Sequence, residues 1–401
     1  MELYPLNLLL IGLLLLIGLF AGQLIGKWGL PRVVAYVLVG VLFSSDFLGR
    51  FFPGNSVEVV RPLTDISLNI IAFIIGGSVT LPQLQRMGKS MLGIAFFEVV
   101  GAMLMVFLAV LLFIPQIAGV SAISLALAFA AISSTTAPAG TIAVLHQYHC
   151  KGPFSSTLLG VVALDDAFGM IFFSIVMAFL VGGSLEHTLE MALLHIAGAM
   201  VLGCVGGYCL AKLTVRVEKK DMLLTLAVSC IFVISSVAEL TQLSALLAIM
   251  SLGFFARLFL YSAGNKLFGS IDFLEESVFL AFFTLAGTHF HIAVFTEHLD
   301  LILVYFFARI VGKVLGAAFG SKITKSPLLV TRWLGFALVP QAGVAVGLAL
   351  TLSYQEAFAE IGLLVVNVVL ATTLIYELVG PLSARFALKK AGEIEARKIS
   401  K

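Results

Sequence analysis

Charged side chains are scarce in this chain: only 11% of its 401 residues are Asp, Glu, Lys or Arg, whereas 60% are hydrophobic. A soluble domain carries about 25% charged residues, so this composition excludes a soluble globular protein and predicts an integral membrane protein. Membrane spans take up nearly the whole length, which leaves no room for a soluble catalytic domain. We therefore expect no enzyme activity, no resident cofactor and no nucleic-acid partner.

Cysteine is rare as well, with four residues in the chain and no CxxC pair among them. Three of the four fall in apolar stretches, so they are expected to be small packing residues and not a disulfide or zinc set. The sequence also lacks a TVGYG filter, which argues against a channel. It lacks a GxGD element, which argues against an intramembrane aspartyl protease whose two aspartates share a proton.

Long apolar runs are abundant, and a membrane helix needs about 20 mostly apolar residues. The first run, Leu6–Gly26, is predicted to be a span and not a signal peptide, because no basic region precedes it and no cleavage site follows. The predicted fold is all-helical with about thirteen spans, near 6–26, 32–45, 63–80, 89–114, 121–145, 154–183, 188–211, 221–238, 243–260, 272–290, 299–320, 330–354 and 358–384.

Lys and Arg are distributed unevenly between the two sides that these spans define. With the N-terminus outside, the outer loops hold only Arg50 and Arg61, whereas the inner loops, inner span ends and tail hold twenty. This bias predicts an outer N-terminus and a cytoplasmic C-terminus in a multi-pass protein of the cell membrane.

Thirteen spans with this orientation divide as six, one and six. We expect one transmembrane transporter domain over residues 1–385, with repeat one near 6–183, a linker helix near 188–211 and repeat two near 221–384. The two repeats would run in opposite directions through the bilayer. Residues 386–401 form a short basic cytoplasmic tail that is expected to anchor at anionic headgroups.

Two adjacent carboxylates, Asp165 and Asp166, lie inside the apolar run from Phe154 to Gly183. A charged carboxylate in hydrocarbon costs at least ~2.5 kcal/mol, so two in succession predict a function. Intramembrane acids face a bundle interior or a water-filled cavity and mark ion or proton paths. A purely structural, buried pair is the alternative interpretation.

Two prolines lie in the middle of predicted spans, Pro138 in SSTTAPAG (133–140) and Pro340 in VPQAG (339–343), where Gln341 follows it. Each removes a backbone hydrogen bond, and irregular backbone is tolerated at this depth only where it is buried or lines a cavity. Matching interruptions in the two halves point to the substrate site of an inverted-repeat transporter. Simple proline kinks are the alternative.

Hydroxyl groups accompany the first interruption, on Ser134, Thr135 and Thr136. Hydroxyl and freed carbonyl oxygens are hard ligands suited to a small cation. The ends of the broken helices would bring partial charges to the same depth. Together with Asp165 and Asp166, these oxygens form the predicted site for protons and a transported Na⁺.

Lys313 is a second intramembrane charge, at a depth of roughly 10–20 Å like the aspartates. A buried ammonium needs a partner, and neighbours on a helix are turned about 100° apart, so one aspartate can hold Lys313 while the other faces the cavity. We expect Asp165 to pair with Lys313. The alternative is Arg309, one turn away, which could hold the pair or meet Glu98 in span four.

Burial favours the neutral form of a carboxylate, whereas a cation partner favours the charged form. A site that binds either a metal cation or protons exchanges them by competition, and these interacting groups titrate as a set. The residues therefore predict a cation/proton antiporter that is electrogenic if more than one proton moves per cation. A K⁺/H⁺ antiporter or an ion-coupled symporter on a related inverted-repeat fold is the alternative.

At these residues the chain resembles the monovalent cation:proton antiporter family, in its electrogenic branch with an Asp-Asp pair. The resemblance covers most of the chain and is carried by LDDAFG (164–169), SSTTAP (133–138), GKVLGAAFG (312–320) and LVPQAGVA (338–345). It implies that Asp166 binds the ion, Na⁺ or Li⁺, and that Asp165 pairs with Lys313. It also implies a homodimer, with a dimerisation domain and a separate moving core that gives alternating access.

Overall fold

Helices make up the regular structure of this protein. The computed structural model describes residues 3–28, 30–51, 56–78, 88–114, 121–137, 141–142, 144–145, 148, 150, 152–181, 185–217, 219–260, 264–355 and 358–394. Within these ranges every regular element is a helix and no strand is present. The predicted fold class, an all-helical membrane protein, is therefore confirmed.

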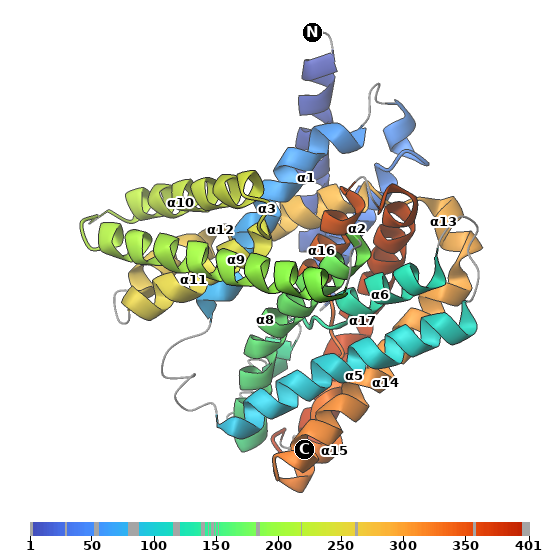
Figure 1. Cartoon of the computed structure of the whole chain (residues 1–401). Coiled ribbons are helices and arrows are strands. Elements are labelled where there is room, and N and C mark those ends of the chain that lie inside the picture. Colours follow the sequence, from blue (N-terminus) through green and yellow to red (C-terminus); the bar gives the residue numbers. More distant parts are fainter. Residues whose placement is uncertain are drawn as a thin grey trace, which may run out of the picture. The chain divides into compact units, whose positions relative to one another are not determined.

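The chain forms two compact units (Figure 1). The first comprises Met1–Arg86, Met170–Glu297 and Val346–Leu370, and the second comprises Met87–Gly169, His298–Ala345 and Ala371–Lys401. Three helices contribute residues to both units: α8 (Pro153–Val181), α16 (Gly343–Ser353) and α17 (Ala359–Lys390). The other helices of the first unit are α1 (Leu3–Lys27), α2 (Arg32–Leu42), η1 (Leu48–Phe51), α3 (Ser56–Ser78), α9 (Leu185–Thr214), α10 (Lys220–Leu240), α11 (Ala245–Leu260), α12 (Gly264–Gly287) and α13 (Ile292–Glu297). Those of the second are α5 (Lys89–Phe113), α6 (Ala122–Ser133), α14 (Leu299–Ile323) and α15 (Leu328–Ala337).

Seven of the described helices are long and apolar enough to cross a membrane, namely α1, α5, α8, α9, α10, α14 and α17. Five shorter apolar helices accompany them, namely α2, α6, α11, α15 and α16. Large apolar side chains point outward, with Leu112 72% and Leu240 85% exposed. Such surfaces are rare on soluble monomers, and they fit a multi-pass membrane protein. The count of thirteen spans stays a prediction.

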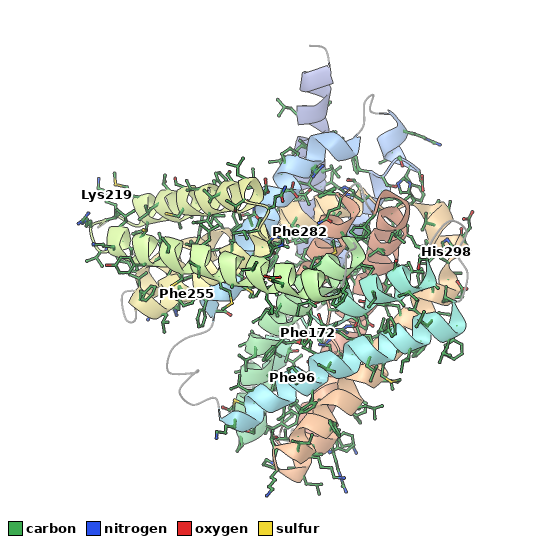
Figure 2. All side chains as sticks on the ribbon, in the orientation of Figure 1. Phe96, Phe172, Lys219, Phe255, Phe282 and His298 are labelled. Carbon is green, nitrogen blue, oxygen red and sulfur yellow. The ribbon has the colours of Figure 1, made fainter. Side chains whose placement is uncertain are left out.

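The first unit is built by close helix packing, and the ion pairs among its described residues have side chains that are at least 25% exposed. A Cβ added at Gly253 of α11 would lie 2.2 Å from the carbonyl oxygen of Phe73 on α3, so only glycine allows this approach. Arg32, the first residue of α2, pairs with Glu276 of α12. Lys219, labelled in Figure 2, immediately precedes α10.

The second unit has a different character, because its buried charges lie in the middle of long helices. Its apolar core joins α5, α8, α15 and α17 around fully buried side chains such as Leu158 and Leu334. Aromatic rings extend the contact between α5 and α8, where Phe96 (Figure 2) meets Phe168 edge-on at 6.0 Å. Asp165 and Asp166, described next, lie on the same helix as Leu158 of this core.

Candidate functional site

Two helices of the second unit stop in mid-course, and their ends meet. α6 ends at Ser133 and is followed by non-helical backbone up to Ala137. α15 ends at Ala337, and α16 begins only at Gly343, so the helix is interrupted where the sequence places Pro340. The amide of Ala137 donates to the carbonyl of Pro340 at 2.9 Å. Pro138 lies outside the described residues.

Side chains tie the two interrupted segments together. Gln341 donates from Nε2 to the carbonyl of Ile132 at 2.9 Å, and its Oε1 accepts from the Tyr305 hydroxyl of α14 at 3.1 Å. Thr136 donates to the carbonyl of Leu338 at 3.4 Å. All of these side chains are buried. Each interrupted segment therefore donates hydrogen bonds to the other where the two segments cross.

Arg309 of α14 lies next to the point where the two interrupted segments cross, and it is fully buried (0% exposed). Its guanidinium donates to the carbonyls of Ser133 (3.0 Å), Thr135 (2.6 Å) and Val339 (2.7 Å), and more weakly to that of Pro340 (3.4 Å). These oxygens lie at and just beyond the C-terminal ends of α6 and α15, where helix carbonyls lack partners.

The face of the same guanidinium lies over the ring of Tyr376 of α17, 4.7 Å from its centroid. A cation over an aromatic face is stabilised by the ring quadrupole. Arg309 thus satisfies two helix ends and makes no ion pair with Asp165 or Glu98 among the described residues. The sequence left open whether Lys313 or Arg309 pairs with these acids, and in the structure Lys313 forms both ion pairs.

Lys313, one turn further along α14, has four oxygen neighbours and no exposed surface. Its Nζ donates to Ser134 O at 2.5 Å, Thr136 Oγ1 at 2.7 Å and Asp165 Oδ2 at 3.0 Å. Glu98 Oε1 lies 2.5 Å from the same nitrogen. The ammonium therefore joins α5, α8 and the segment after α6.

Glu98 reaches Lys313 because α5 and α14 touch backbone to backbone. A Cβ added at Gly101 would lie 2.7 Å from Gly312 O, and one at Gly316 would lie 2.8 Å from Glu98 Cα. No larger residue fits at these positions without moving a helix. The sequence marked Glu98 only as a buried acid within reach of Arg309; the glycines were the signal for its true neighbour.

Asp165 and Asp166 are 0% and 1% exposed and leave α8 in different directions. Asp165 faces Lys313, whereas the Asp166 carboxylate accepts a backbone hydrogen bond from Thr136. The Oδ1 atom of each has no hydrogen-bond partner among the described residues. Two buried carboxylate oxygens are therefore available for a proton or a cation.

The hydroxyls predicted as cation ligands have donor partners of their own. Ser134 donates to Ala131 O at 2.7 Å, and Thr135 donates to Ile132 O at 3.4 Å, both within or near the last turn of α6. Their remaining lone pairs stay available, since a hydroxyl has one donor and two acceptor sites. Within the described part of the chain, no three His, Cys, Asp or Glu side chains are grouped as for a resident metal.

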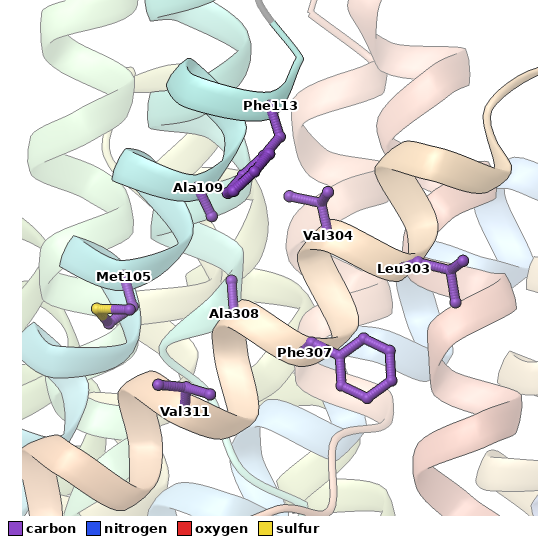
Figure 3. A pocket seen from close by; sticks show the side chains of 8 residues that line it. All are labelled: Met105, Ala109, Phe113, Leu303, Val304, Phe307, Ala308 and Val311. Carbon is purple, nitrogen blue, oxygen red and sulfur yellow. The ribbon is translucent and has the colours of Figure 1, made fainter.

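A cavity of about 360 Å³ opens between α5 and α14 and does not belong to this site (Figure 3). Its eight lining side chains are all apolar, and they include Phe113 and Phe307, which are 69% and 59% exposed. It offers no ligand to a cation and has the character of a lipid-facing surface.

The family pattern described as sodium/hydrogen exchanger, transmembrane, matches residues 11–390. Among similar proteins, the "Probable Na(+)/H(+) antiporter GerT" of Bacillus cereus is 23% identical over 349 residues, which cover 85% of this chain and 90% of that protein. A "Na(+)/H(+) antiporter" of Enterococcus hirae is 22% identical over 377 residues, 91% of this chain and 93% of the relative.

Solved structures agree on the fold. The sodium proton antiporter MjNhaP1 from Methanocaldococcus jannaschii at pH 8 superposes with a TM-score of 0.82 and 18% identity, covering 98% of this chain and 99% of that one. A second structure of MjNhaP1, from an electron-microscopy map, has a TM-score of 0.73 and 16% identity and covers 98% of each chain. With its family pattern matched over nearly its whole length, the chain belongs to the sodium/hydrogen exchanger family.

Proposed function

We propose that this protein exchanges Na⁺ for protons across the cell membrane, at the site formed by Asp165 and Asp166. One observation carries the proposal: two adjacent, fully buried carboxylates lie where two interrupted helices cross, and only one of them faces an ammonium group. Family membership and the names of the relatives support the same activity.

The charge balance of the site favours competition between protons and a cation. A helix C-terminus carries about −0.5 charge, so the two ends that Arg309 contacts roughly neutralise its guanidinium. Lys313 then contacts the carboxylates of Glu98 and Asp165, and the adjacent carboxylate of Asp166 adds a third negative charge to the site. Buried charge without a counter-charge is costly. The excess negative charge is removed when protons bind, or when a metal cation replaces them.

We assign the cation to the carboxylate of Asp166, with hydroxyl and carbonyl oxygens of Ser134, Thr135 and Thr136 as further ligands. Asp165 takes up a proton when it is released from Lys313. If this happens in each cycle, more than one proton moves per Na⁺, and the exchange is electrogenic. The membrane potential then contributes about 2.3 kcal/mol per net charge per 100 mV.

The wider arrangement is proposed on the same basis. We infer two inverted repeats, near 6–183 and 221–384, joined by the linker helix near 188–211, within a transporter domain over 1–385. We also infer an outer N-terminus, a homodimer and a cytoplasmic position for residues 386–401. The first five of these residues end α17, and the exposed Lys389 and Lys390 would face the lipid headgroups. The broken helices that contain Pro138, Pro340 and Gln341 would lie at the centre of the two repeats.

The test is proton movement driven by cations in inside-out vesicles. Asp166→Asn should abolish Na⁺-dependent proton release while the protein still inserts, because the amide has no negative charge to offer either ion. Asp300→Asn, at an exposed carboxylate in the first turn of α14, is the matched control and should keep full activity. Full exchange by Asp166→Asn would remove this residue from its role. Titrations with Na⁺, Li⁺ and K⁺ in the unaltered protein identify the transported cation.

A further inference from the structure

Glu98 has no task in the exchange step proposed above, yet it is one of the most buried acids in the chain. Its side chain is 0% exposed, and its Oε1 lies 2.5 Å from Lys313 Nζ. A glutamate in the middle of a membrane helix is costly unless it is paired. Lys313 is the cation with which it forms an ion pair within the described residues.

The surroundings of Lys313 contain one oxygen more than an ammonium can satisfy. An ammonium group has three protons, and these are donated to Ser134 O, Thr136 Oγ1 and Asp165 Oδ2. Glu98 is the fourth neighbour, and its Oε1 lies at ion-pair distance, 2.5 Å from Nζ. When the N–H group that Lys313 donates to Asp165 is freed, it therefore has a second carboxylate, that of Glu98, at contact distance.

The two acids are also held differently. Glu98 lies on α5, whose backbone touches α14 at Gly101 and Gly316, so its distance from Lys313 is set by a close helix contact. Asp165 comes from α8, whose described contact with α5 includes the rings of Phe96 and Phe168. The close backbone contact thus fixes the spacing of the two helices that carry Glu98 and Lys313.

We propose that Glu98 is a standing counter-ion of Lys313, to which the ammonium turns whenever Asp165 is released. Removing one partner of a buried ion pair is strongly destabilising because it leaves an uncompensated charge. A second carboxylate in contact removes that cost from the exchange cycle. Glu98 is a positioning residue: it acts through Lys313 and makes Asp165 free to exchange. This functional consequence rests on the exchange proposed above, whereas the pairing itself does not.

A double-mutant cycle in thermal stability tests the pairing without any transport assay. Glu98→Gln and Asp165→Asn each leave one carboxylate for Lys313, so each should lower the melting temperature only slightly. Together they leave Lys313 without either carboxylate partner. The loss in melting temperature of the double variant should therefore exceed the sum of the two single losses by at least about 5 °C. Glu377→Gln, at another buried glutamate of the second unit, is the control and should be additive with Asp165→Asn.

A triple variant covers the case in which the double variant does not fold. Adding Lys313→Gln removes the orphaned charge, so the triple variant should recover a folded, monodisperse protein that melts near the single variants. Additive losses in the cycle, or a triple variant no better than the double, would overturn the proposal. These outcomes do not depend on whether the protein exchanges Na⁺.

Exchange kinetics test the consequence. In Glu98→Gln, Asp165 becomes the sole counter-ion, so release is harder and the maximal rate of Na⁺-driven proton movement should fall at least tenfold. Glu98→Asp keeps the charge and should restore part of the rate, whereas Glu377→Gln should stay within twofold of the unaltered protein. A normal rate in Glu98→Gln would contradict the proposal that Lys313 turns from Asp165 to Glu98 during exchange. If the unaltered protein does not exchange Na⁺ for protons at all, the proposed function is contradicted instead.

Discussion

Arg309 and Lys313 lie one turn apart on α14, and both are fully buried, yet they have different kinds of partner. Arg309 binds backbone carbonyls and an aromatic ring, whereas Lys313 binds two carboxylates, a hydroxyl and a carbonyl. Carbonyl groups of helix ends carry fixed partial charges. Carboxylates gain and lose a proton. We therefore expect Arg309 to hold the helix ends of the site together and Lys313 to take part in its changes of charge.

The choice of side chain matches the task. A guanidinium has five N–H groups in a rigid planar fork, which suits several carbonyls at fixed positions. An ammonium is a compact charge on a flexible stem and can turn between acceptors. On this basis, we expect only Lys313 of these two cations to take part in ion exchange. Stability and exchange measurements on the two residues should separate these roles.

Arg309→Lys is expected to have the largest effect on stability. The ammonium cannot reach all the carbonyls of Ser133, Thr135 and Val339 at once, and each buried acceptor without a donor costs about 1–3 kcal/mol. We expect a loss of unfolding free energy on the order of 5 kcal/mol, seen as poor yield of monodisperse protein and a lower melting temperature. Arg332→Lys, at an exposed position of α15, is the control. A melting temperature of Arg309→Lys close to that of the unaltered protein would contradict this stabilising role of Arg309.

Lys313→Gln should reverse the pattern. Its neighbours Glu98 and Asp165 can bind protons once the ammonium is gone, so the fold should lose less stability than in Arg309→Lys. The rate of exchange should fall more than the stability does, because Asp165 then has no ammonium with which to form and break an ion pair in each cycle. We expect at least a tenfold lower rate of Na⁺-driven proton release and a changed charge per cycle, measured as current on a solid-supported membrane. Equal stability losses with intact exchange would show that Lys313 is framework as well.

Part of this site could be predicted from the types of residue in the sequence. Acidic residues at Asp165 and Asp166 inside an apolar run are costly in lipid, and a proline at position 340 cannot complete a helical hydrogen-bond ladder, so both features were visible without coordinates. The depth of Lys313 made Asp165 a candidate partner. These inferences depend on residue type and on distance along one helix, which a sequence does contain.

The partners of Arg309 and Glu98 could not be predicted in the same way. Arg309 binds backbone carbonyls, which are freed only where two interrupted segments come together in space. Glu98 meets Lys313 because glycines let α5 and α14 approach closely, and such contacts depend on which helix faces meet. Residue spacing gave Arg309 as a possible partner of Glu98. The approach of the helices selects the residue one turn further on.

Glu393 is a carboxylate at a helix N-terminus, whereas Arg309 is a cation at two helix C-termini. Substitution of Glu393 is expected to have the smallest effect on the melting temperature. Glu393, just after α17, accepts from the amides of Phe154 (2.7 Å) and Ser155 (3.0 Å) and pairs with the Ser155 hydroxyl. It therefore caps the N-terminus of α8, the helix that carries Asp165. Losing such a cap costs about 1 kcal/mol, so Glu393→Ala should lower the melting temperature by about 2 °C, and the exposed Ser156→Ala should not.

Cys150 reports the charge of this cap. Burial, and after it the nearby Glu393 carboxylate, raises the pKa of the Cys150 thiol. A raised pKa means less thiolate at a given pH, so alkylation of Cys150 at pH 8 should be slow. Glu393→Gln removes the negative charge, lowers the pKa of the thiol and should speed alkylation, read from the modified peptide by mass spectrometry. An unchanged rate would mean that the carboxylate does not act on the thiol. The charge that acts on the thiol is that of Glu393 and not that of the acidic pair, so Lys313→Gln should leave the alkylation rate unaltered. This result would separate the fixed charge at a helix end from the exchangeable charge at the centre of the site.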